Sequence, residues 1–337
     1  MITAFIKFGD GRISTDASNE SIAAALRDPQ AIFWLDIDHP EDENYAMLDD
    51  VFGFHPLAIE DSINRAQRPK IESYDHVGDA CQQGYFYMVI HGVNPVQAKK
   101  RLELQELDMF MSERYLITIH DTPMPPIDYM MGRAKAGAKV VLEPGIDLLL
   151  YKILDRLVDA YQPILDDMQD ELDELEEESV TDPRPELLPR IAHKKRELLN
   201  LRRVIGPQRE VLAQLTRGEV PFIRETTRIY LRDVLDHAIR AVEMIELYRD
   251  LVVGARDIYM SSISNNLNQI MKTLTIITVI ALPMTVITSF FGMNFNTEAI
   301  PVWHWILNTP GGFVLSTCVI LGLIAGLLYV FRRLKWL

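Results

Sequence analysis

Residues Thr273–Phe291 read TLTIITVIALPMTVITSFF, and residues Phe313–Phe331 read FVLSTCVILGLIAGLLYVF. The chain carries no charged side chain from Thr273 to Thr297 or from Ala299 to Phe331. A helix needs about 20 apolar residues to cross a bilayer, so each run is long enough for one span. A buried hairpin in a soluble core is the alternative, but two such runs in succession are rare in soluble proteins. We therefore predict a transmembrane hairpin near the C-terminus.

Basic residues flank the two runs on their outer sides. Lys272 precedes the first run, and Arg332, Arg333 and Lys335 follow the second. Because cytoplasmic flanks carry an excess of Lys and Arg, we expect both termini in the cytoplasm and the connecting loop outside. The N-terminus lacks an apolar stretch behind a basic cluster, so no signal peptide is expected. These features predict a multi-pass protein of the cell (inner) membrane, with the lipid bilayer as a partner.

The composition of the 337-residue chain excludes several classes of protein. With 48% hydrophobic and 24% charged residues it is neither largely disordered nor collagen-like, and its two cysteines form no disulfide framework. The formal net charge is −14, so nucleic acid is a poor partner and cations are natural counterparts of the surface. The sequence has no P-loop, no G-x-S-x-G and no glycine-rich dinucleotide turn. We therefore expect neither an enzyme nor an ATP-driven pump, and no organic cofactor.

The first 145 residues mix short β-type runs with turns. Helical pieces are expected near Ser21–Arg27 and Asn44–Phe52. Four runs predict strands, and they are Ala31–Ile37, Gly84–Val93, Leu104–Met111 and Tyr115–His120. We interpret residues 1–145 as an α+β cytoplasmic domain with a mainly antiparallel sheet.

From residue 146 the pattern becomes helical. Asp147–Glu178 carries apolar residues at spacings of three and four, and nine of its last thirteen residues, from Asp166 onward, are carboxylates. After a proline-rich turn that begins at Thr181, a basic helix follows that includes Arg190 and Lys194. An acidic helix next to a basic one predicts an antiparallel helical hairpin over residues 146–220, with ion pairs across it.

A third helical stretch, residues 221–291, has no strong breaker before Pro283 and continues into the first apolar span. As one helix from Glu225 to Phe291 it has ~65 residues and is on the order of 100 Å long. A helix that is polar in one half and apolar in the other needs neighbours, most simply copies of itself about an axis. We expect residues 292–312 to form the external loop, and residues 313–337 to form the second span and a basic cytoplasmic tail.

One face of this helix alternates polar and bulky apolar residues. Its members follow one another at spacings of three and four, and they are Asn268, Met271, Leu274, Thr278, Leu282 and Thr285. In a symmetric bundle such a stripe lines a narrow pore, where apolar rings gate by dewetting and polar rings hold hydrated ions. Packing between helices is the alternative, because Thr is common at transmembrane interfaces without any role in transport.

The first span ends in Phe291-Gly-Met-Asn-Phe, directly before the external loop. With Gly292, Met293 and Asn294 at this position, the sequence resembles the CorA metal-ion transporters. The resemblance covers most of the chain. Further matching segments are HPLAIED at His55–Asp61, QRPKIE at Gln67–Glu72, YRDLV at Tyr248–Val252, DIYMSSISNN at Asp257–Asn266, MKTLTII at Met271–Ile277 and KWL at Lys335–Leu337.

The resemblance implies a funnel-shaped homopentamer. Each subunit would contribute a cytoplasmic αβα domain, a stalk helix that becomes the pore-lining span, and an outer second span. Gly292, Met293 and Asn294 would ring the outer mouth, and Glu298 would add negative charge there. The implied activity is passive, potential-driven import of Mg²⁺, with Co²⁺ and Ni²⁺ also carried by many members. Because Mg²⁺ dehydrates reluctantly, a ring of Asn294 amide oxygens suits the hydrated ion.

The resemblance also implies closure by cytoplasmic Mg²⁺ bound between neighbouring subunits. The implied regulatory ligands are Glu60 and Asp61 in the N-terminal domain, and Asp233 and Asp257 in the stalk. Carboxylates that face each other across a subunit boundary repel unless a cation lies between them. Taken alone, each of the four is also typical of solvated surface charge in a chain with 48 acidic residues.

Two other functions stay open on the sequence. The first is a zinc transporter of a related two-span branch, although the eight histidines show no H-x-x-x-H or H-x-H spacing. The second is a membrane-tethered sensor or scaffold that transports nothing. A scaffold accounts for the long helices, but it does not account for Asn294 or for the polar stripe.

Overall fold

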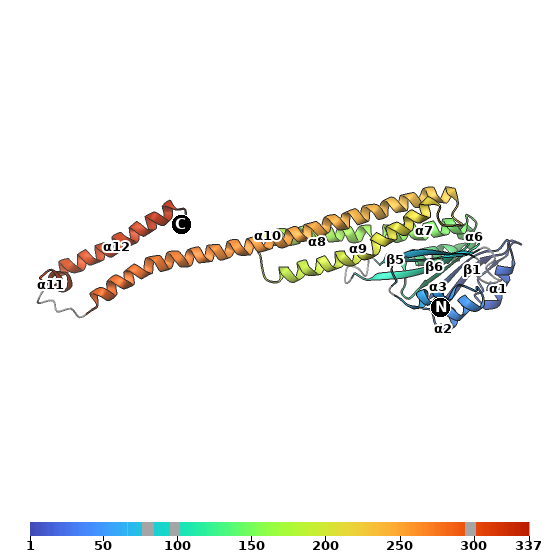
Figure 1. Cartoon of the computed structure of the whole chain (residues 1–337), viewed down its shortest axis with the longest axis horizontal. Helices are drawn as coiled ribbons and strands as arrows, with labels where there is room; N and C mark the ends of the chain where they lie inside the picture. Colours follow the sequence, from blue (N-terminus) through green and yellow to red (C-terminus); the bar gives the residue numbers. More distant parts are fainter. Residues whose placement is uncertain (66, 76–83, 95–101, 294–300, 337) are drawn as a thin grey trace. The chain divides into compact units, whose positions relative to one another are not determined.

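The structure is a computed structural model that describes residues 1–65, 67–75, 84–94, 102–293 and 301–336. The chain divides into two compact units, Met1–Arg256 and Asp257–Leu337. The first unit is built on a sheet and the second on apolar helices (Figure 1). Helix α10 (Glu225–Phe291) begins in the first unit and ends in the second.

Among its described residues, the first unit contains a mixed seven-stranded sheet in the order β2-β1-β3-β7-β6-β5-β4. Strands β3 and β7 pair in parallel, and the other neighbouring pairs are antiparallel. Every residue of β5 is buried, because layers of helices cover both faces of the sheet at its position. The strands are β1 (Ile2–Lys7), β2 (Ile13–Ser14), β3 (Ile32–Asp38), β4 (Lys70–Tyr74), β5 (Tyr85–Val93), β6 (Leu104–Met111) and β7 (Tyr115–His120).

The four strands expected from the sequence are present as β3, β5, β6 and β7. The sequence pattern does not predict β1, β2 and β4. Strand β2 has two residues and β4 reads KIESY, so neither shows the apolar run that marks a strand. Strand β1 is held by antiparallel pairing with β3 over six positions, and such long-range pairing is invisible in a local window.

Three helices cover one face of the sheet: α1 (Asn19–Arg27), α2 (Asp42–Asp50) and α3 (Pro56–Ile63). The sequence predicts α1 and α2 but not α3, which is only eight residues long. The start of α3 is nevertheless well defined. Pro56 fits its first turn, and the His55 ring accepts a hydrogen bond from the backbone N–H of Leu57 (3.2 Å).

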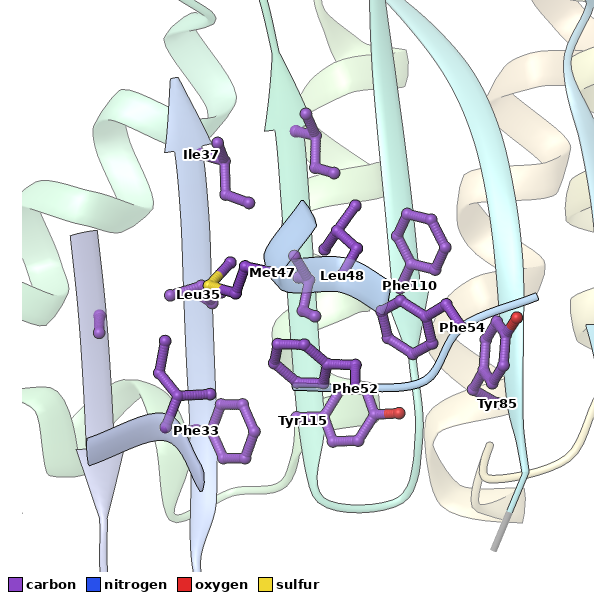
Figure 2. Close-up of a cluster of buried hydrophobic side chains, with 14 of the residues drawn as sticks. Phe33, Leu35, Ile37, Met47, Leu48, Phe52, Phe54, Tyr85, Phe110 and Tyr115 are labelled. Carbon is purple, nitrogen blue, oxygen red and sulfur yellow. The ribbon is translucent and has the colours of Figure 1, made fainter. Parts of the chain in front are cut away.

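Figure 2 shows the hydrophobic core between these helices and the sheet. Side chains alternate along a strand, so Phe33, Leu35 and Ile37 of β3 all point to this core. Aromatic rings fill its other end, where Phe54 stacks on Phe110 with ring centroids 4.5 Å apart. This dense packing makes the sheet a rigid platform for the loops at its edges.

Helices α5 (Pro125–Ala136), α6 (Ala138–Leu142) and α7 (Ile146–Asp159) pack on the opposite face. Helix α7 contacts β3, β5 and β7, with Leu149, Leu150 and Ile153 among its buried side chains. The first unit is therefore a three-layer αβα sandwich, which is the layer order that the family resemblance implies.

The helical run expected over Asp147–Glu178 is broken into two helices, α7 and α8 (Gln162–Thr181). Pro163 gives the reason for the break. Proline has no N–H to donate, and its ring clashes with the preceding turn, so it is tolerated only where a new helix begins.

Helix α8 packs against α9 (Leu187–Arg217) as an acidic and basic pair. Arg190 forms an ion pair with Glu178 (2.8 Å), and Lys194 forms one with Glu171 (2.5 Å). The order of these contacts along the chain makes the two helices antiparallel, as the charge pattern predicts.

The second unit contains the apolar half of α10, helix α11 (Pro301–Asn308) and helix α12 (Pro310–Arg333). Helices α10 and α12 are long and apolar enough to cross a membrane, and only 6% and 0% of their apolar windows are buried in the chain. That exposure argues against a buried hairpin in a soluble core. The expected external loop contains α11, whose Val302, Trp305 and Ile306 follow helical spacing.

Candidate ion pathway

The predicted pore stripe lies on one face of α10. At 100° per residue, its six members fall within about one third of the helix circumference. All six side chains are exposed in a single chain, and Met271 and Leu282 are 60% and 63% exposed. The helix continues through Pro283 to Phe291, as helices in membranes tolerate. Apolar side chains so exposed need lipid or further copies of the chain against them.

The threonine hydroxyls of the stripe are oriented by the helix backbone. The Thr278 hydroxyl donates to the carbonyl of Leu274 (2.8 Å), and the Thr285 hydroxyl donates to the carbonyl of Ala281 (2.9 Å). A hydroxyl has one hydrogen, so what each oxygen still offers is its acceptor lone pairs. This face of α10 therefore offers hydrogen-bond acceptors between bulky apolar groups.

The C-terminal end of α10 is closed by backbone hydrogen bonds. The N–H of Gly292 donates to the carbonyl of Thr288 (3.0 Å), and the N–H of Met293 donates to the carbonyl of Phe290 (3.3 Å). Both predicted mouth residues therefore extend the last turn. Asn294 and Glu298 lie outside the described residues, so their roles at the mouth stay predictions.

The end of the hairpin at Lys272 and Lys335 is also held by a hydrogen bond. The ammonium group of Lys272 on α10 donates to the backbone carbonyl of Lys335 (3.0 Å), just after α12. The Trp336 ring stacks on Phe331 with centroids 5.8 Å apart, and the backbone N–H of Trp336 donates to the Phe331 carbonyl (2.8 Å). The basic tail thus folds back on the end of its own helix.

Two of the predicted regulatory carboxylates, Glu60 and Asp61, lie in the C-terminal half of α3. Glu60 is exposed, whereas Asp61 forms an ion pair with Lys70 of β4, which also contacts Glu72 (3.0 Å). Burial alone would lower the pKa of Lys70, but its hydrogen bonds to Asp61 and Glu72 outweigh burial and raise it. A cation that binds Asp61 therefore competes with the Lys70 ammonium group.

Asp233 on α10 belongs to a group of acidic side chains within the first unit. Its carboxylate is 68% exposed and lies 4.0 Å from Nε2 of His237, whose Nδ1 is 2.8 Å from Asp159 on α7. Burial raises the pKa of Asp155, and the negative charges of Asp159 and Asp233 raise it further. A cation at this face would relieve the repulsion among the three carboxylates.

The family resemblance pointed to Asp233, but the sequence analysis did not include Asp155, Asp159 and His237. The signal was available, because Asp155 with Asp159 and Asp233 with His237 are both pairs separated by four residues. Which helices pack together, however, is a tertiary fact that spacing does not contain. Asp257, the fourth predicted ligand, is exposed and lies in the second unit.

Within the described part of a single chain, no group of three or more His, Cys, Asp or Glu side chains has a geometry that could hold a metal ion. The same residues show no ion pair or hydrogen bond that joins Asp61 to Asp233.

A family model described as "CorA-like Mg²⁺ transporter protein" matches residues 29–333. The chain belongs to this family. Its relatives include the putative metal ion transporter YfjQ of Bacillus subtilis, 35% identical over 91% of this chain and 90% of that protein. The cobalt/magnesium transport protein CorA of Thermotoga maritima is 34% identical over 93% of this chain and 85% of its own length.

Solved structures agree with this assignment at the level of the fold. The complete CorA magnesium transporter from Methanocaldococcus jannaschii matches with a TM-score of 0.80 at 24% identity, covering 100% of this chain and 99% of that one. The zinc transport protein ZntB of Yersinia pestis is a more distant relative, 22% identical over 97% of this chain and 94% of its own length. As a CorA-family protein, the chain is a divalent cation transporter, and α10 and α12 are its membrane spans.

Proposed function

We propose that this CorA-family protein is a passive channel that imports Mg²⁺, with Co²⁺ and Ni²⁺ as further cargo. Five copies would surround one pore, with the apolar half of α10 lining it and α12 outside. Both termini would lie in the cytoplasm, so that Asn294 and Glu298 ring the outer mouth. Mg²⁺ bound between the cytoplasmic units of neighbouring subunits would close the channel.

The observation that carries this proposal is the orientation of the threonine hydroxyls on α10. Thr278 and Thr285 have their hydroxyl hydrogens bonded to the helix backbone, which leaves oxygen lone pairs for the pathway. The water molecules around a cation point their hydrogens outward. Lone pairs from several copies of α10 therefore suit a hydrated cation that keeps its water shell, as Mg²⁺ prefers to do.

The apolar members of the stripe supply the means of closing the pathway. Met271 and Leu274 stand at the cytoplasmic end of the stripe, and Leu282 stands between the two threonines. Where copies of these side chains approach one another, water leaves the constriction and a hydrated ion has no path. A small separation of the helices restores water and conduction.

Membrane potential alone supplies the energy for uptake. Each elementary charge that crosses a potential of 100 mV gains ~2.3 kcal/mol, so a dication gains roughly 4.6 kcal/mol. Neither a second coupled ion nor a nucleotide-hydrolysing site is needed for accumulation of Mg²⁺ under these conditions.

The carboxylates of the cytoplasmic unit support control by internal Mg²⁺. Asp155, Asp159 and Asp233 already raise each other's electrostatic energy within one chain. A neighbouring subunit that presents Glu60 and Asp61 would add further negative charge. Such an interface is stable only with cations bound, so a fall in internal Mg²⁺ loosens the ring of subunits.

The test is ion uptake into proteoliposomes with an inside-negative potential, for the wild type, Asn294→Ala and the control Asn308→Ala. Potential-driven Mg²⁺ entry that is lost in Asn294→Ala and retained in the control supports both the channel and its mouth residue. Zn²⁺ entry that follows a proton gradient, without Mg²⁺ flux, would assign the chain to the zinc branch. No flux of either ion through folded protein would favour a tethered sensor.

A further inference from the structure

A cavity of about 520 Å³ lies in the cytoplasmic unit, away from the acidic face around Asp233. It lies at the ends of three inner strands, where β5 and β7 end and β6 begins. Helix α9 forms another wall. Three arginines, Arg65, Arg68 and Arg203, line it together with two carboxylates, Glu106 and Asp121. The ion pathway uses none of these residues.

The walls of the cavity are fixed by buried hydrogen bonds. The backbone N–H of His91 on β5 donates to the side-chain oxygen of Gln208 on α9 (3.0 Å). The hydroxyl of Tyr161, next to α8, donates to the backbone carbonyl of His91 (2.7 Å). The first bond holds α9 against β5 and the second holds the start of α8 there, so the walls of the cavity are fixed without a ligand.

Both carboxylates of the cavity already have donors. Arg65 forms ion pairs with Asp121 (2.8 Å) and with the fully buried Asp108, and it therefore has little capacity for a ligand. The backbone N–H of Gln67 donates to Glu106 (3.0 Å).

The other two arginines are different. Arg68 and Arg203 are exposed, and neither forms an ion pair with a carboxylate among the residues that the structure describes. They come from separate elements, the segment before β4 and helix α9, yet they line the same cavity. In a chain of net charge −14, two arginines that line one cavity favour the binding of an anion there.

We propose that this cavity binds an organic phosphate of about the size of a nucleoside diphosphate. Arg68 and Arg203 would bind the phosphate groups, because the planar guanidinium matches two phosphate oxygens at once. The volume is within the roughly 300–1,000 Å³ of small-molecule sites and is much larger than one phosphate ion needs. Apolar side chains give the organic part a wall, and they are Pro69, Leu102, Leu104 and Val204.

Neutral polar side chains complete the site. The amides of Gln67 and Asn200 and the hydroxyl of Thr122 line the same cavity and suit sugar hydroxyl groups. The proposal concerns binding alone, with no bond made or broken, and it is independent of the proposed ion transport. It links the cytoplasmic unit to the pool of soluble phosphate esters.

Calorimetric titration of the full-length protein in detergent, without Mg²⁺, tests the proposal. The probes are ADP, adenosine and inorganic phosphate, and the variants are Arg68→Gln, Arg203→Gln and the control Arg209→Gln. Arg209 is an exposed arginine of the same helix α9 that does not line the cavity. We expect ADP to bind more tightly than either fragment, with a loss of about tenfold or more for each cavity arginine and no change in the control.

Hydrogen exchange on the wild type provides a second readout that needs no variant. ADP should protect backbone amides near Leu104–Glu106 and Asn200–Val204, which lie on opposite walls. The proposal is wrong if ADP does not bind, if Arg68→Gln and Arg203→Gln both bind it as tightly as the wild type, or if protection appears only elsewhere. Equal affinity for ADP and inorganic phosphate would also overturn it, because the cavity would then recognise an anion and no organic part.

Discussion

Replacing Asp147 by alanine is expected to detach the start of the long helix α10 from the sandwich. Asp147 lies in the first turn of α7 and is 3% exposed. Its carboxylate accepts hydrogen bonds from the Arg224 guanidinium (2.5 and 2.9 Å), from the Arg224 backbone N–H (3.2 Å) and from the Thr227 hydroxyl (2.6 Å). Both donors belong to the segment where α10 begins, so one carboxylate ties the two helices together.

The loss of unfolding free energy depends on which groups lose a hydrogen-bond or ion-pair partner. Removing one member of a buried ion pair costs about 3–5 kcal/mol when the other charge stays buried. The Arg224 side chain is 55% exposed and can turn to water, whereas the Thr227 hydroxyl is buried and would be left without its acceptor. We therefore place Asp147→Ala at the lower end, about 3 kcal/mol of unfolding free energy.

A matched control is the surface pair of Lys7 and Glu143, whose side chains are 26% and 49% exposed at 3.1 Å. Glu143→Ala should cost no more than about 1 kcal/mol, because water screens an exposed pair. Residues 1–256 contain a single tryptophan, the fully buried Trp34, so urea unfolding of this unit can be followed by its fluorescence. Equal losses in Asp147→Ala and Glu143→Ala would refute the reasoning.

The same carboxylate predicts a dependence on pH. Burial alone would raise the pKa of Asp147, but the hydrogen bonds from Arg224 and Thr227 outweigh it and hold the pKa below its usual value. The stabilisation is therefore present above the unfolded-state pKa of about 3.9 and disappears as the pH falls through the folded-state value. The stability difference between wild type and Asp147→Asn should shrink at acid pH.

Three further predictions concern transport and acid sensitivity. Thr278→Val should reduce Mg²⁺ uptake about tenfold by removing an acceptor worth ~1 kcal/mol or more, whereas Thr278→Ser and the control Thr273→Val, about 140° away on the helix, should retain it. Asp233→Ala should weaken closure by internal Mg²⁺, and unchanged protease protection by Mg²⁺ would count against this role. Burial lowers the pKa of His91 to about 4, so between pH 7 and 5 the first unit of the wild type should lose about 2 kcal/mol more unfolding free energy than that of His91→Gln, measured by urea unfolding.

The sequence predicts the helices of the second unit more completely than the strands of the first unit. Both ends of α10, Glu225 and Phe291, could be predicted because helical spacing continues along this stretch without a strong helix breaker before Pro283. Strands β1 and β4 could not be found in the same way, since each forms through partners far away in the chain. The break at Pro163 was readable in principle, but a strong apolar spacing on both sides masked it.

The candidate sites also differ in whether one helix or several elements form them. The stripe on α10 is a property of one helix, so its spacing alone defines its face. Arg68 and Arg203 line the same cavity although they are 135 positions apart in the sequence (203 minus 68), because α9 packs on β4 and β5. The acidic face around Asp233 likewise depends on how α7 packs beside α10. No local window contains that information.

The apolar span of α10 contains no carboxylate, and the double charge of the proposed Mg²⁺ cargo gives a physical reason for this. A dication inside a low-dielectric span interacts with a single carboxylate far more strongly than in water, and such a site would hold the ion rather than pass it. In the proposed pore, the hydroxyl lone pairs of Thr278 and Thr285 would instead bond the ion's water shell, and such weak contacts form and break at little cost. Asp61 and Asp233 lie in the first unit, where the proposed regulation would need cations that bind tightly and exchange slowly. The same Coulomb energy accounts for both placements. Weak acceptors in the span let an ion pass, whereas carboxylates outside the span retain one.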